Sequence, residues 1–263
     1  MTKVVTLLTD FGLEDGYVAC MKGVILSIAP HVHLVDASHL IPAQAICSGA
    51  FVLSSFYSFF PPDTIHLAVV DPGVGTSRKA IVLRSSQYTF VGPDNGLFSF
   101  ILKNEPKCKC RALENPAHFR SSVSMTFHGR DIFAPVAAHL AAGAPWEDFG
   151  PPHDPYVAEW VSARHTPMGV SGEIVHLDRF GNGITNITRQ DLENFPEERD
   201  LSTSVRGWSL SIVPGTYAQM EKDRPFALWG SSDHLEIACN QGSAARMLEL
   251  SPGTPVHVRK TRR

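Results

Sequence analysis

The sequence predicts an α/β protein with an N-terminal doubly wound, mainly parallel sheet domain and a smaller C-terminal β-barrel domain. Three observations lead to this prediction. Apolar strand segments alternate with helical segments through residues 1–150. Residues 151–168 are proline-rich and poorly periodic, which is typical of a linker. Residues 169–263 consist of short apolar runs separated by turn residues, with one short helical segment at 243–250.

Strands and helices of the first domain follow from its hydrophobic periods. Met21, Val24, Ile25 and Ile28 share one face of an expected helix, which Pro30 ends. In a sheet of this kind, ligands bind beyond the carboxyl ends of the strands. The expected strands are 4–10, 32–36, 64–71, 80–85 and 88–92, and the expected helices are 16–29, 43–60, 95–103 and 129–143.

The second domain is expected to contain little helix. Its apolar runs are short, and glycine, proline, asparagine and aspartate separate them, which favours a small antiparallel barrel. The expected strands are 171–178, 184–188, 208–213, 226–231, 234–239 and 255–260.

The composition of the chain indicates which classes of partner it binds and in which cellular compartment it is expected. The chain has 263 residues, 43% of them hydrophobic and 19% charged, with a net charge of −3. A chain without a basic field is not expected to bind nucleic acid or an anionic membrane, which favours a small-molecule ligand. No apolar run approaches about 20 residues, so no membrane span is expected. The first residues lack a signal-peptide pattern, and five scattered cysteines favour reduced thiols and a cytoplasmic protein.

Three aspartates, Asp10, Asp36 and Asp71, each fall at the carboxyl end of an expected strand. An acid in such a place can accept both hydroxyls of a ribose, although Asp10 could equally cap a turn. The chain has no GxGxxG after its first strand and no GxxxxGK[ST] anywhere. A nucleoside without phosphates fits this combination.

The stretch VVDPGVGTSRKA places one carboxylate, Asp71, and one guanidinium, Arg78, around a glycine-rich turn. Taken alone, the aspartate could cap the turn and the arginine could be solvated. His128 precedes an expected helix and titrates near neutrality, but a histidine in a loop is more often inert.

A metal site is a weaker interpretation of the histidines near the second strand. His31, His33 and His39 lie close in sequence to Asp36 and could join Asp10 around an ion. They lack an HExxH or CxxC partner, so no metal is expected.

Two stretches of the second domain carry candidate ligand contacts. In HLDRFGNGITNI, Phe180 could stack on a purine and Asn182 could bind its edge, as amides bind adenine elsewhere. In GSSDHLEIACNQGSA, Ser231 and Ser232 could hold a carboxylate. Each stretch could instead be a simple hairpin turn.

Taken together and in order, six stretches closely resemble the S-adenosyl-L-methionine (SAM) hydroxide adenosyltransferases, relatives of the fluorinating and chlorinating enzymes. They are TLLTDFGLEDGYVACMKG, VVDPGVG, VGPDNGLF, FHGRDIFAPVAAHLAAG, DRFGN and LEIACNQGSAA. The resemblance spans essentially the whole chain. It implies an α/β domain before a β-barrel, SAM as the substrate, and neither cofactor nor metal. It also implies a homotrimer that binds the nucleoside between one subunit's first domain and its neighbour's second.

The resemblance assigns Asp71, Arg78 and His128 to the attacking water or hydroxide. The halogenating branch carries a tyrosine in place of Asp71, a threonine in place of Val74 and a serine in place of Gly129. Hydroxide is expected rather than halide, because an aspartate at the centre repels a halide ion and the hydroxyls are missing.

The same resemblance assigns the substrate contacts. Asp10 would accept the ribose hydroxyls, Asp178 would meet the methionine amine, and Phe180 would pack on the adenine. Asn182 would bind the adenine edge, and Ser231 would lie near the methionine carboxylate. 

Other positions leave questions open. Asn95 also matches the family, with no role assigned to it. Ser232 replaces an arginine of the fluorinating enzyme, and Ala43 replaces its tryptophan near the ligand. The fluorinating enzyme's insertion between its fourth and fifth strands is absent.

The expected reaction is hydrolysis of SAM to adenosine and L-methionine by in-line attack at ribose C5′. The proton of the water would pass to His128, with Asp71 orienting the imidazole and Arg78 fixing Asp71, or Asp71 and Arg78 would polarise the water directly. The sequence leaves both routes open. The alternative functions are a SAM-dependent halogenase and a SAM- or adenosine-binding protein without turnover.

Overall fold

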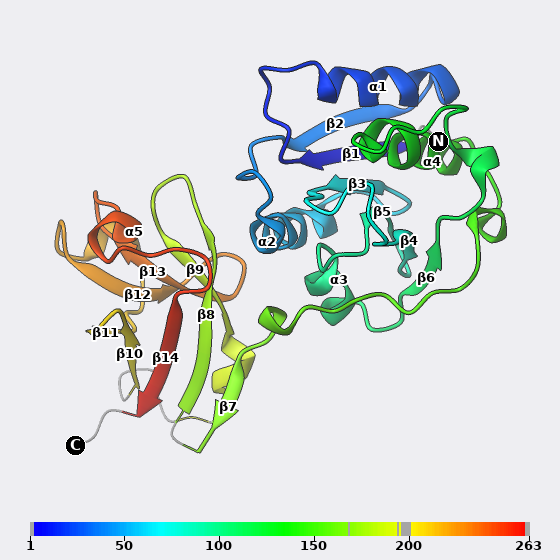
Figure 1. The fold of residues 1–263 in the computed structure, drawn as a ribbon. Coiled ribbons are helices and arrows are strands. Elements are labelled where there is room, and N and C mark those ends of the chain that lie inside the picture. The colour runs from blue at the N-terminus through cyan, green and yellow to red at the C-terminus, as the bar shows by residue number, and fades with distance from the viewer. Residues whose placement is uncertain (1–2, 168, 194, 196–200, 261–263) are drawn as a thin grey trace. The chain divides into compact units, whose positions relative to one another are not determined.

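The computed structural model describes residues 3–167, 169–193, 195 and 201–260, and it divides into two compact units, Met1–Ala158 and Glu159–Arg263 (Figure 1). Outside the described residues lie residues 1–2 of the predicted first domain, residue 168 of the predicted linker, and residues 194, 196–200 and 261–263 of the predicted second domain. None of the helices in the described ranges is both long and apolar enough to cross a membrane.

The first unit is built on a mixed six-stranded sheet. Four of its strands, β1, β2, β3 and β5, run parallel, and β4 runs antiparallel to both of its neighbours. The prediction of a mainly parallel sheet is therefore confirmed. The strand order is β2 (His33–Ser38), β1 (Val4–Thr9), β3 (Ile65–Val69), β5 (Thr89–Pro93), β4 (Ala80–Arg84) and β6 (Lys109–Ala112).

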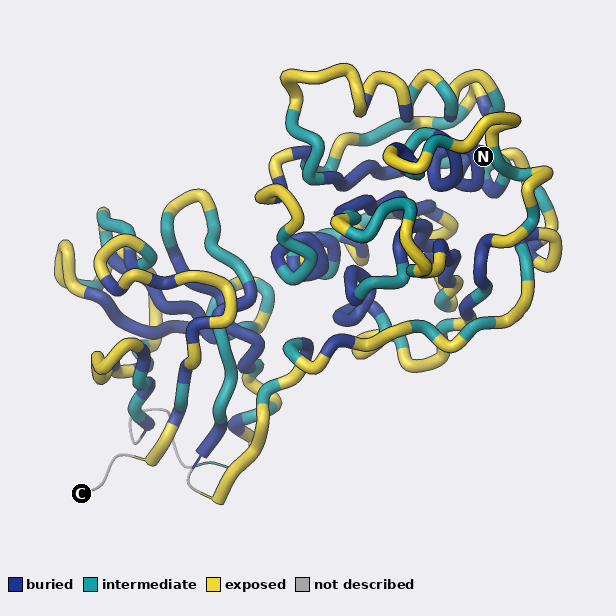
Figure 2. Tube along the Cα trace, viewed as in Figure 1, coloured by how far each residue is buried: buried dark blue, intermediate teal, exposed yellow. Residues whose placement is uncertain are grey.

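Helices cover both faces of this sheet. On one face, α1 (Tyr17–Ile28) and α4 (Ala134–Ala141) share a buried core with β1 and β3. On the other face lie α2 (Ile46–Phe56) and α3 (Ser99–Asn104), as Figure 1 shows. Figure 2 shows the buried residues concentrated along the strands and the helix faces turned toward them. Burial of these apolar surfaces is the main stabilising contribution to the unit.

The segment expected as one helix at 129–143 has two parts. Gly129–Phe133 forms a π-helical turn, and α4 follows it directly. Pro135 occupies one of the first two positions of α4, at the junction with the π turn, where the backbone hydrogen-bond pattern changes. The π turn lies next to His128, and such turns are frequent at functional sites.

The second unit is a nearly closed, mostly antiparallel barrel, which confirms the predicted second domain type. Ile212, just after β11, bridges to Ala227 of β12 and draws the two ends of the strand path together. The path runs β11 (Trp208–Ser211), β10 (Leu201–Val205), β14 (Pro255–Lys260), β8 (Gly169–Leu177), β9 (Gly183–Thr188), β13 (His234–Cys239) and β12 (Pro225–Trp229).

Short elements complete both units. β7 (Arg164–Thr166) pairs with β8 and lies inside the segment expected as a linker, and α5 (Ala244–Met247) follows β13. Single-turn 3₁₀ helices occur at Tyr57–Phe59, Pro116–His118, Trp146–Phe149, Glu159–Val161, Arg189–Leu192 and Tyr217–Gln219.

Candidate active site

Two of the three strand-end aspartates lie together at one edge of the first sheet. Asp10 directly follows β1, and Asp71 lies two residues beyond the end of β3. The two strands are parallel neighbours, and the last residue of one pairs with the last residue of the other. Asp71 lies near enough to contribute to the raised pKa of Asp10, for which burial is the larger cause.

The third aspartate, Asp36, has a local role instead. It lies within β2, which continues to Ser38. Its carboxylate binds the ammonium group of Lys22 at 2.6 Å and Nε2 of His39 at 3.0 Å. Asp36 therefore anchors side chains around β2.

Arg78 contacts both Asp71 and His128, so Arg78 rather than Asp71 holds the imidazole. Arg78 Nε donates to Asp71 Oδ1 at 2.9 Å, and Arg78 Nη2 donates to Asp71 Oδ2. The same Nη2 donates to Nδ1 of His128 at 2.8 Å. The side chains of Arg78 and Asp71 are only 10% and 5% exposed. The geometry of this bidentate pair is fixed, because the planar guanidinium of Arg78 matches the carboxylate of Asp71 and little solvent reaches either group.

This contact identifies the tautomer of His128. Arginine has donors only, so Nδ1 of His128 must present its lone pair to Arg78. The proton of the neutral imidazole then lies on Nε2. Burial and the charge of Arg78 lower the pKa of His128, although Asp71 and Asp131 oppose this. The ring is therefore neutral at neutral pH and points a donor, Nε2–H, away from Arg78.

Gly75 allows the turn after Asp71 to approach the loop that leads to His128. Gly75 has a φ of +76°, and a Cβ there would lie 2.3 Å from the carbonyl oxygen of Met125. The turn after Asp71 can therefore contact the loop that leads to His128 only if residue 75 has no side chain.

Asn95 braces the other side of the turn. Its Nδ2 donates to the carbonyl oxygen of Val70 at 2.9 Å, and its Oδ1 accepts from the N–H of Leu97 at 3.2 Å. The amide therefore fixes the chain just before Asp71. Phe133 supports the cluster from the π turn, with its ring centroid 5.3 Å from Cζ of Arg78.

In the second unit, Asp178 organises the turn between β8 and β9. Its Oδ1 accepts from the N–H groups of Phe180 and Asn182 at 2.9 and 2.8 Å, and its Oδ2 accepts from Asn182 Nδ2 at 2.9 Å. This fixes the buried Asn182 and presents Phe180, which is 77% exposed, to solvent. An aromatic ring held this far out of the fold is available to a ligand.

Asp178, Phe180, Asn182 and Ser231 line one cavity of 780 Å³ in the second unit. The same cavity contains Glu236 and Tyr217, which the sequence analysis did not single out. A glutamate in the apolar strand segment HLEIAC was a detectable sign, because a charge at an inward strand position needs a partner. The remaining lining residues are Gly215, Thr216, Leu228, Trp229, Gly230, Cys239, Gln241 and Gly242.

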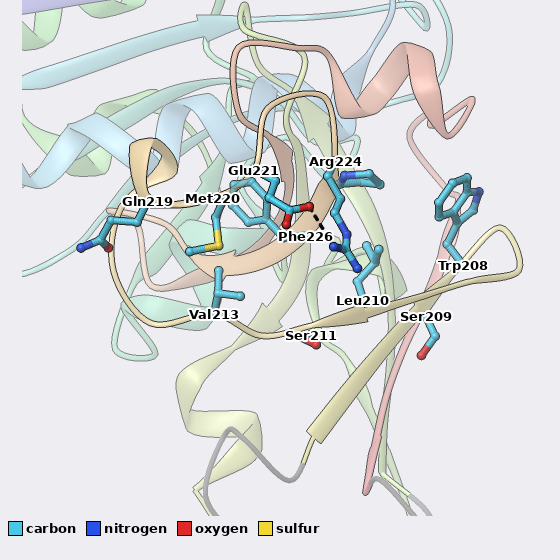
Figure 3. Close-up of a pocket in the computed structure, with 11 residues that line it drawn as sticks. Trp208, Ser209, Leu210, Ser211, Val213, Gln219, Met220, Glu221, Arg224 and Phe226 are labelled. Carbon is cyan, nitrogen blue, oxygen red and sulfur yellow. Dashed lines mark hydrogen bonds and ion pairs between the residues drawn. The ribbon is translucent and has the colours of Figure 1, made fainter.

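A second cavity of the barrel, shown in Figure 3, has a volume of 370 Å³ and contains none of the predicted site residues. Trp208 and Leu210 of β11 line it together with Phe226 of β12. An ion pair at 2.9 Å joins Arg224 and Glu221 at its edge. These charged side chains are largely exposed, which makes them useful for control substitutions.

His39, one of the histidines considered for a metal site, has other partners. His39 bonds to Oγ1 of Thr9 through Nδ1 and to Asp36 through Nε2. Within the described ranges, no group of three or more histidine, cysteine, aspartate or glutamate side chains is arranged to hold a metal ion.

Two family models match the chain, one for each unit. The SAM hydroxide adenosyltransferase N-terminal domain matches residues 5–150, and the corresponding C-terminal domain matches residues 172–257. Together these matches cover most of the sequence.

Known proteins similar to this chain extend the match to full length. An (R)-S-adenosyl-L-methionine hydrolase of Thermus thermophilus is 38% identical, covering 97% of this chain and 98% of the relative. A fluorinase of an Actinoplanes species is 27% identical, covering 98% and 97%. The crystal structure of an uncharacterized conserved protein from Thermotoga maritima superposes with a TM-score of 0.88 at 34% identity, covering 97% of this chain and all of that one. The chain belongs to the SAM hydroxide adenosyltransferase family.

Proposed function

We propose that this protein hydrolyses SAM to adenosine and L-methionine by in-line attack of water at ribose C5′. The observation that carries the proposal is the contact of Asp71, Arg78 and His128 at the carboxyl edge of the parallel strands. Ligands of such sheets bind at this edge. Similarity to hydrolases named for the same substrate supports the choice of SAM.

The reaction needs a positioned oxygen more than it needs an acid. The water oxygen forms a bond to C5′ as the C5′–S bond breaks, and the electron pair of that bond goes to sulfur. Methionine leaves as a neutral thioether, so no group has to protonate it. A pocket with little water favours this step, because charge on the sulfonium disappears as the new bond forms.

The hydrogen bonds favour Asp71 over His128 as the proton acceptor. Nδ1 of His128 already accepts from Arg78, and its Nε2 carries a proton, so the neutral ring has no lone pair for the water. The ring can donate from Nε2 to the water oxygen and orient it. Each oxygen of Asp71 accepts one bond from Arg78 and retains a second lone pair, to which the water proton passes.

Residues of both units are assigned to contacts with the substrate. We assign the ribose hydroxyls to Asp10, whose Oδ2 already accepts from the N–H of Gln44 at 2.8 Å and is thereby oriented. We assign the adenine face to Phe180 and its edge to Asn182. Asp178 and Ser231 lie in the same cavity and would face the amino-acid part. The bonds of Asn95 support a positioning role for that residue.

We further propose a homotrimer in the cytoplasm, with the nucleoside between the first unit of one subunit and the second unit of its neighbour. The resemblance to the family implies this arrangement. The division of the assigned residues between the two units is compatible with it. Light scattering after size-exclusion chromatography tests the assembly, and a mass of three chains is expected, whereas a monomer contradicts it.

Position 129 also favours hydroxide over halide. A Cβ at Gly129 would lie 3.2 Å from the ring of Phe127 and 3.3 Å from the ring of Phe11. A serine there, as in the halogenating branch, requires these aromatic rings to shift by a few tenths of an ångström. The charge of Asp71 also opposes a halide ion.

Chromatography of the products tests the proposed function. The purified protein, incubated with each sulfonium epimer of SAM, is expected to release adenosine and methionine in equal amounts from at least one epimer. EDTA, chloride and fluoride are expected to change neither product. Dependence on a metal, a 5′-halogenated nucleoside, or tight nucleoside binding without any product would each contradict the proposal.

The state of His128 predicts the acid limb of the pH profile. The neutral ring is the active form, and its pKa is lowered from 6.5 by burial and by Arg78. The kcat/KM for SAM is therefore expected to be at its plateau at about pH 8 and to fall to half of that plateau only below about pH 6.5. Stopped assays across the range measure this. In the His128→Asn variant the limb should shift to lower pH, and a wild-type limb centred above neutrality would contradict the assignment.

A further inference from the structure

The cavity of the second unit is acidic. Asp178 and Glu236 both line it, and none of its described lining residues is a lysine, arginine or histidine. Two carboxylates without a basic side chain favour a cation, since a desolvated negative charge needs an opposite charge or hydrogen-bond donors. The oxygens of Asp178 already accept three hydrogen bonds from Phe180 and Asn182, so its capacity for a ligand is largely used.

Glu236 has the free capacity that Asp178 lacks. It lies on β13, and only 8% of its surface is exposed. The Tyr217 hydroxyl donates to Oε2 at 2.6 Å, while no described residue donates a hydrogen bond to Oε1. Burial, the largest cause, raises the pKa of Glu236, and the charge of Asp178 adds to this. A bound cation would relieve both effects.

Gly230 makes room for this carboxylate. A Cβ at position 230 would lie 1.8 Å from Oε1 of Glu236. Any side chain there would push the carboxylate out of its place against the loop that contains Ser231. The backbone at position 230 therefore allows Glu236 to reach the cavity.

We propose that Glu236, oriented by Tyr217, accepts hydrogen bonds from the ammonium group of the substrate's amino-acid part. This rests on the proposed function. An ammonium has three donors and a compact charge, which a buried carboxylate matches. The lack of a cationic side chain in the described lining means that this cavity offers the substrate carboxylate no ion pair. The enzyme thus depends more on the amino group of an adenosyl sulfonium substrate than on its carboxylate.

Three substrates compared on the wild-type protein test this selectivity. They are SAM, its decarboxylated form, which keeps the amine, and the analogue that keeps the carboxylate but lacks the amine. Loss of the amine is expected to lower kcat/KM by about 10- to 100-fold, because a charge-assisted hydrogen bond is lost. Loss of the carboxylate should lower it less than loss of the amine does, because the described lining offers the carboxylate no cationic side chain.

The Glu236→Gln variant tests the residue itself. The amide keeps the shape of the side chain and an acceptor for Tyr217 but removes the charge. The KM for SAM is expected to rise about 10- to 100-fold with little change in kcat, since the amine is remote from C5′. The preference for amine-bearing substrates should also disappear, which a merely structural role of Glu236 would not cause.

Glu221→Gln is the matched control. Glu221 is exposed at the edge of the other cavity of the barrel, where it pairs with Arg224 (Figure 3). Its substitution should leave KM, kcat and substrate preference unchanged. Tyr217→Phe should raise KM less than Glu236→Gln does, because the carboxylate remains.

The outcomes separate the two proposals. If the wild-type protein forms no adenosine from SAM, the proposed function fails and the inference fails with it. If the wild type is active but Glu236→Gln keeps its KM and its amine preference, only the inference is overturned. If Glu236→Gln does not fold, the substrate comparison decides: a larger loss from removing the carboxylate than from removing the amine overturns the inference.

Discussion

Replacing Asp71 with asparagine is expected to lower kcat for adenosine formation by about 10²- to 10⁴-fold, which is the usual contribution of a positioned general base. The amide keeps the size of the side chain but cannot take a proton from water. It also leaves Arg78 with a neutral partner, so the positive charge of Arg78 beside His128 is no longer offset by a carboxylate. Binding should change far less, because the carboxylate acts on the water. Single-turnover assays give the rate, and calorimetry gives the Kd for SAM.

Asp36→Asn is the matched control for this variant. Asp36 lies on β2, which β1 separates from β3, and it pairs with Lys22 and His39, outside the Asp71 cluster. Its replacement should leave kcat within about twofold of the wild type, because exposed ion pairs contribute little. An Asp71→Asn enzyme that retains kcat within a similar factor would contradict the role of Asp71.

Gly75→Ala is expected to affect both stability and catalysis. The backbone there has a φ of +76°, and the added methyl carbon would lie 2.3 Å from the carbonyl oxygen of Met125. Left-handed strain and overpacking together should lower the free energy of unfolding by about 2–5 kcal/mol. The loop that carries His128 must move away from Asp71, and a misplacement of this kind lowers kcat by about 10²-fold. Urea unfolding and steady-state kinetics measure the two effects.

Gly143→Ala separates strain from crowding. Gly143, which follows the end of α4, has a φ of +91°, but a Cβ there would have no neighbour within 4 Å. This variant should lose only the backbone contribution, about 1–2 kcal/mol, and keep its kcat. Equal stability losses in the two variants, with kcat unchanged in both, would show that Gly75 does not position the site.

The fold could be predicted from the sequence where hydrophobic periods are strong. Strands β1 and β3 are mostly apolar and almost fully buried, and they place Asp10 and Asp71 at one edge. Strand β10, with the sequence LSTSV, was missed because serine and threonine weaken its apolar signal, although its alternate residues are buried. The four-residue β6 was too short to detect.

The site could be predicted only in part. Asp71 and Arg78 are seven residues apart and could be linked by their shared turn, but His128 lies 50 residues beyond Arg78. Its position was suggested by resemblance, whereas its tautomer depends on a hydrogen bond that no sequence pattern encodes. The charge of Glu236 inside an apolar strand was a sign that could have been used, whereas its contact with Tyr217 depends on how the chain folds in three dimensions.

Hydrolysis in H₂¹⁸O tests the attack of water on C5′ most directly. Mass spectrometry of the products should show one ¹⁸O atom in adenosine, at the 5′ oxygen, and none in methionine. This result follows if the water held by Asp71 and His128 forms the new bond to carbon. Adenosine without the label, or label in the methionine, would contradict the proposed mechanism.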